Sequence, residues 1–129
     1  MENSSKNILI IEDEVLILKS LEMILSSKGP KVQTTTMGTT GLELILNNNF
    51  DLIICDLMLN DLSGFDVLEG SLKVYSREDI KNKFIIMSAY NSEQILEKAK
   101  SYGCFFLRKP FENIHKTSEE IIMRLTNHD

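Results

Sequence analysis

The stretch LIIEDE, residues 9 to 14, joins an apolar run to three consecutive acidic residues, Glu12, Asp13 and Glu14. Two carboxylates about 4 Å apart repel each other by about 4 kcal/mol at an effective dielectric constant of about 20. Such repulsion is large beside the roughly 5–15 kcal/mol that keeps a domain folded. A hard divalent cation bound next to this segment would relieve the repulsion.

Four further apolar runs follow along the chain, and residues with helical spacing come after each run. The five runs occupy residues 8–11, 32–35, 52–55, 84–87 and 104–107. Three of them, ILII, LIIC and FIIM, lack alternation, which is typical of strands covered on both faces. Apolar residues at 3.6 spacing predict helices within residues 17–25, 42–46, 64–75, 95–102 and 114–125.

This alternation predicts an α/β fold, a doubly wound five-stranded parallel sheet with helices on both faces. Gly29-Pro30 ends the first helix, while Asn91 or Ser92 caps the fourth and Gly103 closes it. We expect one domain spanning residues 1–129, with a core at about 7–127. The fold by itself names no function.

Composition excludes some classes of function. The 129 residues are 43% hydrophobic and 26% charged with a net charge of −5, and the absence of a basic stripe argues against direct nucleic-acid binding. No apolar segment approaches the 18 or so residues of a membrane span, so a cytoplasmic protein is expected. Cys55 and Cys104 lie in apolar runs and are expected to be reduced.

Polar residues follow four of the five predicted strands. Glu12 and Asp13 follow the first, Asp56 the third, Ser88 the fourth and Lys109 the fifth, whereas nothing obvious follows the second. Ligands of such sheets bind beyond the carboxyl ends of the strands, where these residues would meet.

Three carboxylates, a hydroxyl and an ammonium group in one place suit a metal ion and a phosphoryl group. Mg²⁺ prefers oxygen ligands and binds through one or two carboxylates, with water and phosphate oxygens completing its octahedron. The lysine and the hydroxyl would engage the outer phosphoryl oxygens, whose charge such a site stabilises.

Each residue also has an ordinary structural interpretation. Asp13 could cap the first helix, Asp56 could belong to a polar turn, Lys109 could be a solvated loop residue, and Ser88 could bond to local backbone. The combination at four strand ends favours a shared site. His115 and His128 are expected to be solvated and to hold no metal.

The order of these motifs resembles the receiver domain of two-component response regulators, a CheY-like family. The resemblance covers residues 8–125 and rests on the acidic pair, Asp56, Ser88-Ala89 and Lys109-Pro110-Phe111. It implies a flavodoxin-like sheet with strand order 2-1-3-4-5. In that order a strand separates Cys55 from Cys104, and two strand spacings of about 9–10 Å exceed the reach of a disulfide.

The resemblance implies that Asp56 accepts a phosphoryl group from a phosphohistidine of a sensor histidine kinase or a phosphotransfer protein. Mg²⁺, or Mn²⁺, would bind Asp13, Asp56 and the backbone carbonyl of Met58, with Glu12 acting through water. Such a domain catalyses only its own phosphorylation and slow dephosphorylation, and is not otherwise an enzyme.

The resemblance also implies how the signal is passed on. Lys109 would pair with Asp56 and then with the phosphoryl group, and Ser88 would move inward to bond it. Phe106 would be the aromatic switch, although a packed strand residue is an equal interpretation. In the family the Lys109-Pro110 bond is usually cis. In the family the usual signalling face is formed by the fourth predicted helix, the fifth strand and the fifth helix, and some members form homodimers through it. The sequence does not identify the output partner.

The chain departs from the family pattern at a few positions. Asn60 stands where many members have proline, and Ser88 replaces the commoner threonine. Met58 and Tyr90, two residues past Asp56 and Ser88, occupy positions that influence loss of the phosphoryl group. Neither side chain activates water, so we expect slow self-dephosphorylation.

The same pattern has three alternative interpretations. A phosphohydrolase with an aspartyl nucleophile commonly has a second Asp at the position of Met58, and a flavodoxin-type electron carrier needs a phosphate loop where EDEV would repel phosphate. A degenerate receiver, which binds partners without phosphorylation, is the more serious alternative.

Overall fold

The computed structural model describes residues 3–126, which form a five-stranded parallel sheet flanked by helices. The strands are β1 (Asn7–Ile11), β2 (Lys31–Thr35), β3 (Leu52–Asp56), β4 (Phe84–Ser88) and β5 (Phe105–Arg108). Their order is β2-β1-β3-β4-β5, which confirms the expected order 2-1-3-4-5.

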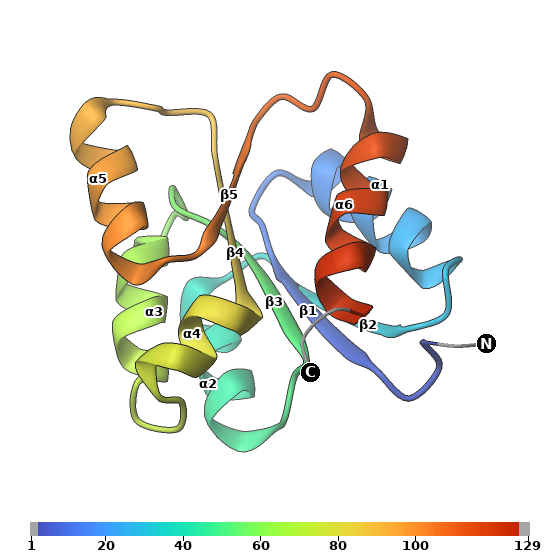
Figure 1. Ribbon diagram of the computed structural model, residues 1–129, viewed down its shortest axis with the longest axis horizontal. Coiled ribbons are helices and arrows are strands. Elements are labelled where there is room, and N and C mark those ends of the chain that lie inside the picture. The colour runs from blue at the N-terminus through green and yellow to red at the C-terminus, as the bar shows by residue number, and fades with distance from the viewer. Residues whose placement is uncertain (1–2, 127–129) are drawn as a thin grey trace.

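Helices cover both faces of the sheet, as the doubly wound prediction requires. They are α1 (Val15–Ser26), α2 (Gly38–Asn47), α3 (Gly64–Ser71), α4 (Arg77–Lys83), α5 (Glu93–Tyr102) and α6 (Ile114–Thr126). Helices α1 and α6 lie on one face, and α2 to α5 lie on the other (Figure 1).

The structure contains one helix more than the five predicted within its described residues. Helix α3 ends at Ser71 rather than near residue 75, and the short helix α4 follows it. Ser76 and Asp79 form a capping box at the start of α4. The predicted signalling face therefore corresponds to α5, β5 and α6.

The apolar strands divide their side chains between two cores. Leu9 and Ile11 of β1 pack on the α2–α5 side, whereas Ile8 and Ile10 pack on the α1–α6 side. Every residue of β3 and β4 is likewise buried. Burial on both faces explains why these runs are apolar at every position.

Local signals in the sequence have the predicted effects. Ser92 caps α5 by accepting the backbone N–H of Ile95, and Gly103 ends the helix with a positive φ of 74°. The Lys109–Pro110 bond is cis. His115 is exposed, as expected, and His128 lies outside the described residues. None of the helices within residues 3–126 is long and apolar enough to cross a membrane.

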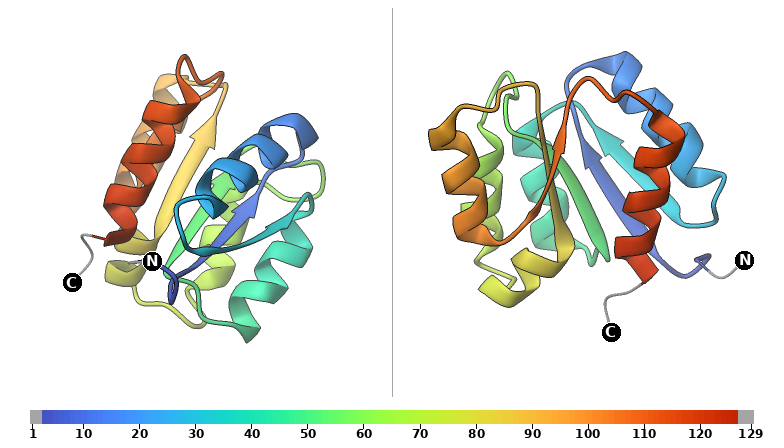
Figure 2. Two further views of the ribbon diagram at one scale, coloured as in Figure 1. Left: turned by 90° about the vertical axis from the view of Figure 1, so that its right-hand side faces the viewer. Right: turned by 45° about the horizontal axis from the view of Figure 1, so that its top comes forward.

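The parallel register brings the carboxyl ends of the strands to one edge. Ile11 pairs with Cys55 and Asp56 with Met87, so the residues that follow β1, β3 and β4 emerge side by side. Figure 2 shows the loops after these strands gathered at the same end of the sheet. The functional residues predicted from the sequence lie at this edge.

Candidate functional site

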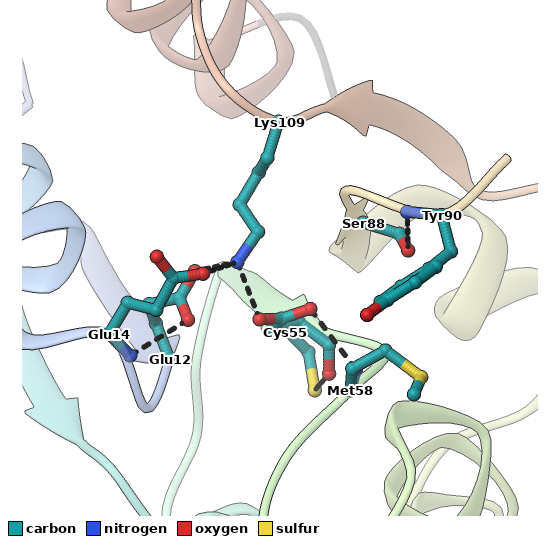
Figure 3. Close-up of polar contacts among 8 residues, drawn as sticks. Glu12, Glu14, Cys55, Met58, Ser88, Tyr90 and Lys109 are labelled. Carbon is teal, nitrogen blue, oxygen red and sulfur yellow. Dashed lines mark hydrogen bonds and ion pairs between the residues drawn. The ribbon is translucent and has the colours of Figure 1, made fainter.

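Lys109 links three carboxylates at the carboxyl edge of the sheet. Its Nζ lies 2.7 Å from Asp56 Oδ2, 2.8 Å from Glu12 Oε1 and 2.8 Å from Glu14 Oε1. Figure 3 shows the lysine side chain reaching from the end of β5 toward the two glutamates. The ammonium group of Lys109 thus offsets part of the repulsion for which the sequence suggested a divalent cation.

Most of this cluster is withdrawn from solvent. Glu12 is 0% exposed, Asp56 2% and Lys109 8%. A buried charge is tolerated when it is paired and hydrogen-bonded, as each of these is. The interpretation of Lys109 as a solvated loop residue is therefore wrong.

The pKa values of the cluster reflect burial and pairing. Burial raises the pKa of Glu12 to about 7, against the opposing effect of Lys109 and with a smaller contribution from Asp56. Burial alone would lower the pKa of Lys109, but its hydrogen bonds to Asp56, Glu12 and Glu14 raise it overall. Lys109 is therefore charged at neutral pH.

Glu14 was not predicted as a site residue, although its ion pair with Lys109 places it in the cluster. Its side chain is 60% exposed, unlike the buried pair. The only signal in the sequence was its place in the run Glu12-Asp13-Glu14. Nothing local to that run indicates a bond to a residue 95 positions away.

Glu12, Asp13 and Asp56 form a group of oxygen donors suited to a hard cation. One carboxylate oxygen from each lies within 4.8 Å of the others. Opposite ligands of Mg²⁺ stand about 4 Å apart, so a small closing movement would bring the donors to bonding distance. The donor set is all oxygen and therefore fits Mg²⁺ or Mn²⁺ better than a thiolate- or imidazole-seeking metal.

The alternative for Asp13, capping of α1, is not found. The N-cap of α1 is Glu14, and no side chain accepts a capping hydrogen bond there. Asp13 is half-buried and remains available to a ligand. Its neighbour Glu12 instead accepts the backbone N–H of Glu14 through Oε2 at 3.1 Å.

An open cavity of about 170 Å³ lies above Asp56. Its lining comprises Glu14, Asp56, Met58, Ala89, Tyr90 and Lys109. The side chains of Met58 and Tyr90 are 52% and 58% exposed, and that of Tyr90 extends from the end of β4 toward Met58 (Figure 3). A small anionic group could reach Asp56 through this opening.

Comparison with known proteins identifies the family. Residues 8–119 match the response regulator receiver domain. The chain belongs to this family. The receiver fold and the order of its motifs are thus those that the sequence indicated.

Similar proteins include curated and structurally solved receivers. The cell cycle response regulator CtrA of Brucella ovis is 31% identical over 119 residues, which are 92% of this chain and 47% of that protein. A CheY-like receiver domain protein from Methanospirillum hungatei is 29% identical with a TM-score of 0.81, covering 93% of each chain. A receiver domain from Clostridium thermocellum is 27% identical with a TM-score of 0.77, covering 95% of this chain and 92% of that one.

The chain spans about half the length of the curated relatives that it matches. Receiver membership sets aside the flavodoxin-type carrier and the phosphohydrolase as classes for this domain.

The two residues of the expected switch sit at neighbouring strands of the receiver. Ser88 is buried at the end of β4, and its Oγ accepts the backbone N–H of Tyr90 at 2.9 Å. This is the local bond that was considered for a serine at a strand end. Phe106, on β5, is half-buried against the core on the α2–α5 side, so it is a packed strand residue in this state.

Proposed function

We propose that this receiver accepts a phosphoryl group on Asp56 in a Mg²⁺-dependent reaction, and that phosphorylation changes a partner-binding face. The observation that carries the proposal is the position of Asp56 at the base of an open cavity, ion-paired to Lys109 at 2.7 Å and beside the acidic pair. A nucleophile, a cation site and a fixed ammonium group are the parts that phosphoryl transfer requires.

The proposed step is an attack on phosphorus by a carboxylate oxygen of Asp56. An O–P bond forms while the N–P bond of a donor phosphohistidine breaks, and the imidazole nitrogen keeps the electron pair and takes a proton. Met58 N–H donates to Oδ1 of Asp56 at 3.1 Å, and Lys109 pairs with Oδ2. These two contacts orient the carboxylate toward the cavity.

Asp13, Asp56 and the backbone carbonyl of Met58 would hold Mg²⁺ or Mn²⁺, with Glu12 bound through water. The bound ion would neutralise charge that develops on the phosphoryl oxygens. Lys109 would then exchange one of its carboxylate partners for a phosphoryl oxygen. Its three existing ion pairs keep its ammonium group at the cavity before transfer.

Transmission of the signal is proposed to begin at Ser88. Its hydroxyl would leave the Tyr90 N–H and bond the phosphoryl group, and Phe106 would turn inward into the space released. The change would alter the face of α5, β5 and α6, which would bind an output partner or a second copy. A histidine kinase or phosphotransfer protein would be the donor, in the cytoplasm.

The second candidate is a degenerate receiver that binds a partner without phosphorylation. No observation in the described residues favours it, because Asp56, Lys109 and the acidic pair are all present and close together. It predicts that the protein takes no label at Asp56.

Labelling by a small phosphodonor tests the proposal. Wild type, Asp56→Asn and Asp79→Asn are incubated with acetyl phosphate or phosphoramidate, with Mg²⁺ or with EDTA, and intact mass is recorded. Asp79 is a half-buried acid that caps α4, so it controls for loss of a carboxylate elsewhere. We expect Mg²⁺-dependent phosphorylation of wild type and Asp79→Asn only. If Asp56→Asn is still phosphorylated, Asp56 is not the acceptor. If wild type takes no phosphoryl group, the protein is a degenerate receiver.

Met58 and Tyr90 are proposed to prolong the life of the acyl phosphate. Both line the cavity above Asp56, and neither carries a group that activates water. We expect the phosphorylated protein, freed of donor, to lose its label over minutes or longer, and Met58→Ala with Tyr90→Ala to shorten that time. Hydrolysis within seconds in wild type contradicts this expectation.

A further inference from the structure

The end of β2 and the start of α2 lie between Glu12 and Asp61. No role was predicted from the sequence for the end of β2. In the structure, the last residue of β2 forms a hydrogen bond with Glu12, and the first two residues of α2 form hydrogen bonds with Asp61. Asp61 lies in the loop of residues 57–63 between β3 and α3, which also carries Met58.

Asp61 caps α2 from outside that helix. Its Oδ1 accepts the N–H of Gly38 and its Oδ2 accepts the N–H of Thr39, each at 2.9 Å. The helix's own N-cap residue, Met37, supplies no side-chain bond. Both oxygens of Asp61 are thus used on N–H groups that would otherwise have no partner within the helix.

The electrostatics of Asp61 agree with this contact. The Thr39 N–H, followed by that of Gly38, lowers the pKa of Asp61 to about 2. The positive end of the α2 dipole also favours a carboxylate at this place. Asp61 is therefore ionised and bound at neutral pH.

Close packing supports the same contact. A Cβ atom at Gly38 would lie 3.1 Å from Leu59 Cδ1, 3.1 Å from Leu62 Cβ and 3.2 Å from Asp61 Oδ1. Three residues of the loop thus rest on the first residue of α2. Glycine at this position permits the approach.

The last residue of β2 is bonded to Glu12 of the acidic pair. Glu12 N–H donates to the Thr35 carbonyl at 3.1 Å, and Met37 N–H donates to Thr35 Oγ1 at 3.2 Å. Hydrogen bonds therefore run from Glu12 through Thr35 and Met37 to the start of α2, and from there to Asp61.

The loop that carries Asp61 is itself closed at its base. Met58 and Ser63 form an isolated antiparallel bridge, and Gly64 N–H donates to the Leu57 carbonyl at 2.9 Å. Met58 N–H donates to Asp56 Oδ1 at 3.1 Å. The loop is therefore held at its base near Asp56 as well as at Asp61.

We infer that Asp61 is a positioning residue, which holds the loop bearing the Met58 carbonyl against α2 so that the proposed metal ligands after β1 and at the end of β3 keep their relative places. The inference rests on the proposed function, since it concerns the same metal site. Asp61 would act through these ligands and would not itself bind the metal or the phosphoryl group.

The affinity for Mg²⁺ tests this role. Asp61→Ala, Asp61→Asn and the control Asp79→Ala are titrated with Mg²⁺ by calorimetry at fixed ionic strength, after circular dichroism has shown that each is folded. Asp61 and Asp79 are both half-buried and both accept backbone N–H groups at a helix start, so each replacement removes one charge and one capping group. Asp79 lies with Lys6 and Asp51 at the opposite edge of the sheet.

We expect Asp61→Ala to weaken Mg²⁺ binding about tenfold, as loss of a supporting hydrogen bond around a metal site does. Asp61→Asn keeps one acceptor and should recover part of this loss, although it has lost the same charge. Asp79→Ala should bind as wild type does. Saturating Mg²⁺ should restore phosphorylation of Asp61→Ala, because the acceptor itself is intact.

The outcomes separate this inference from the proposed function. Folded Asp61→Ala that binds Mg²⁺ with wild-type affinity overturns the positioning role and leaves Asp56 phosphorylation intact. Equal weakening in Asp61→Asn and Asp61→Ala also overturns it, because charge alone would then explain the effect. Wild type that binds no Mg²⁺ overturns both.

Discussion

Lys109 forms ion pairs with three carboxylates, of which those of Glu12 and Asp56 are buried and that of Glu14 is exposed. An exposed ion pair contributes little to stability, whereas a buried one is costly to break because it leaves an uncompensated charge. The three contacts, although similar in length, therefore differ in energetic weight.

Replacing Lys109 with Met should lower the free energy of unfolding by about 3 kcal/mol without metal. This loss is at the low end of the range for breaking a buried ion pair. Glu12, with a pKa of about 7, can take up a proton and so lose the charge that would be left unpaired. Added Mg²⁺ should restore part of the lost stability. Urea unfolding followed by circular dichroism measures these changes.

Glu14→Gln is the matched control for that experiment, since it breaks one of the same ion pairs at an exposed position. It should change the free energy of unfolding by less than about 1 kcal/mol. Equal effects of Glu14→Gln and Lys109→Met would contradict the distinction between exposed and buried partners.

At the scale of elements, helix α3 packs closely on the strand that carries Asp56. A Cβ atom at Gly64 would lie 2.6 Å from the Asp56 carbonyl oxygen and 2.9 Å from Leu57 Cα. Both neighbours are backbone atoms of the site, so they cannot rotate away from an added Cβ atom as a side chain could. Gly64 is therefore needed for close approach.

Gly64→Ala should lower the free energy of unfolding by about 2 kcal/mol through overpacking and should slow phosphorylation of Asp56. Gly70→Ala, in the same helix, is the control. Its Cβ would meet the flexible side chain of Leu42, and the gain of about 1 kcal/mol in helix propensity should offset the adjustment. Thermal unfolding and labelling rate are the measurements; a Gly64→Ala protein that matches wild type in both would refute the packing argument.

Sequence signals for elements succeeded where the element was long or clearly capped. Ser92 and Gly103 mark the ends of the ten-residue helix α5. Helix α4 has only seven residues and one buried side chain, Ile80. Its sequence therefore lacks the apolar periodicity that would predict a helix. Its capping box, Ser76 with Asp79, was the available signal.

At the scale of the whole molecule, the strand order separates the two cysteines. Cys55 lies on β3 and Cys104 precedes β5, with β4 between these strands. Both are free thiols, as expected. Burial raises the pKa of Cys55 strongly and that of Cys104 to about 11, so both remain protonated at neutral pH.

The native protein should therefore resist alkylation. Iodoacetamide at neutral pH should leave both cysteines unmodified over an hour while labelling both after unfolding in guanidinium, as read by peptide mass. Rapid native labelling of Cys104, which is only half-buried, would show that its surroundings open more readily than the packing indicates.

The α/β fold and the residues gathered at the carboxyl edge of the sheet could be predicted from the sequence. Strands buried on both faces must be apolar throughout, and parallel strands bring their carboxyl ends together, so the pattern alone places Glu12, Asp56, Ser88 and Lys109 in one region. Burial and topology follow general rules, and these rules produce a repeating pattern of apolar and polar residues along the chain.

The bonds between the side chains at that edge could be learned only from the folded protein. Glu14 reaches Lys109 across 95 positions, and Asp61 reaches Gly38 across 23. Such bonds depend on the path of a loop and the direction of a side chain, neither of which produces periodicity in the sequence. They form because charged groups and backbone N–H groups that lose contact with water must find partners wherever the fold brings them near.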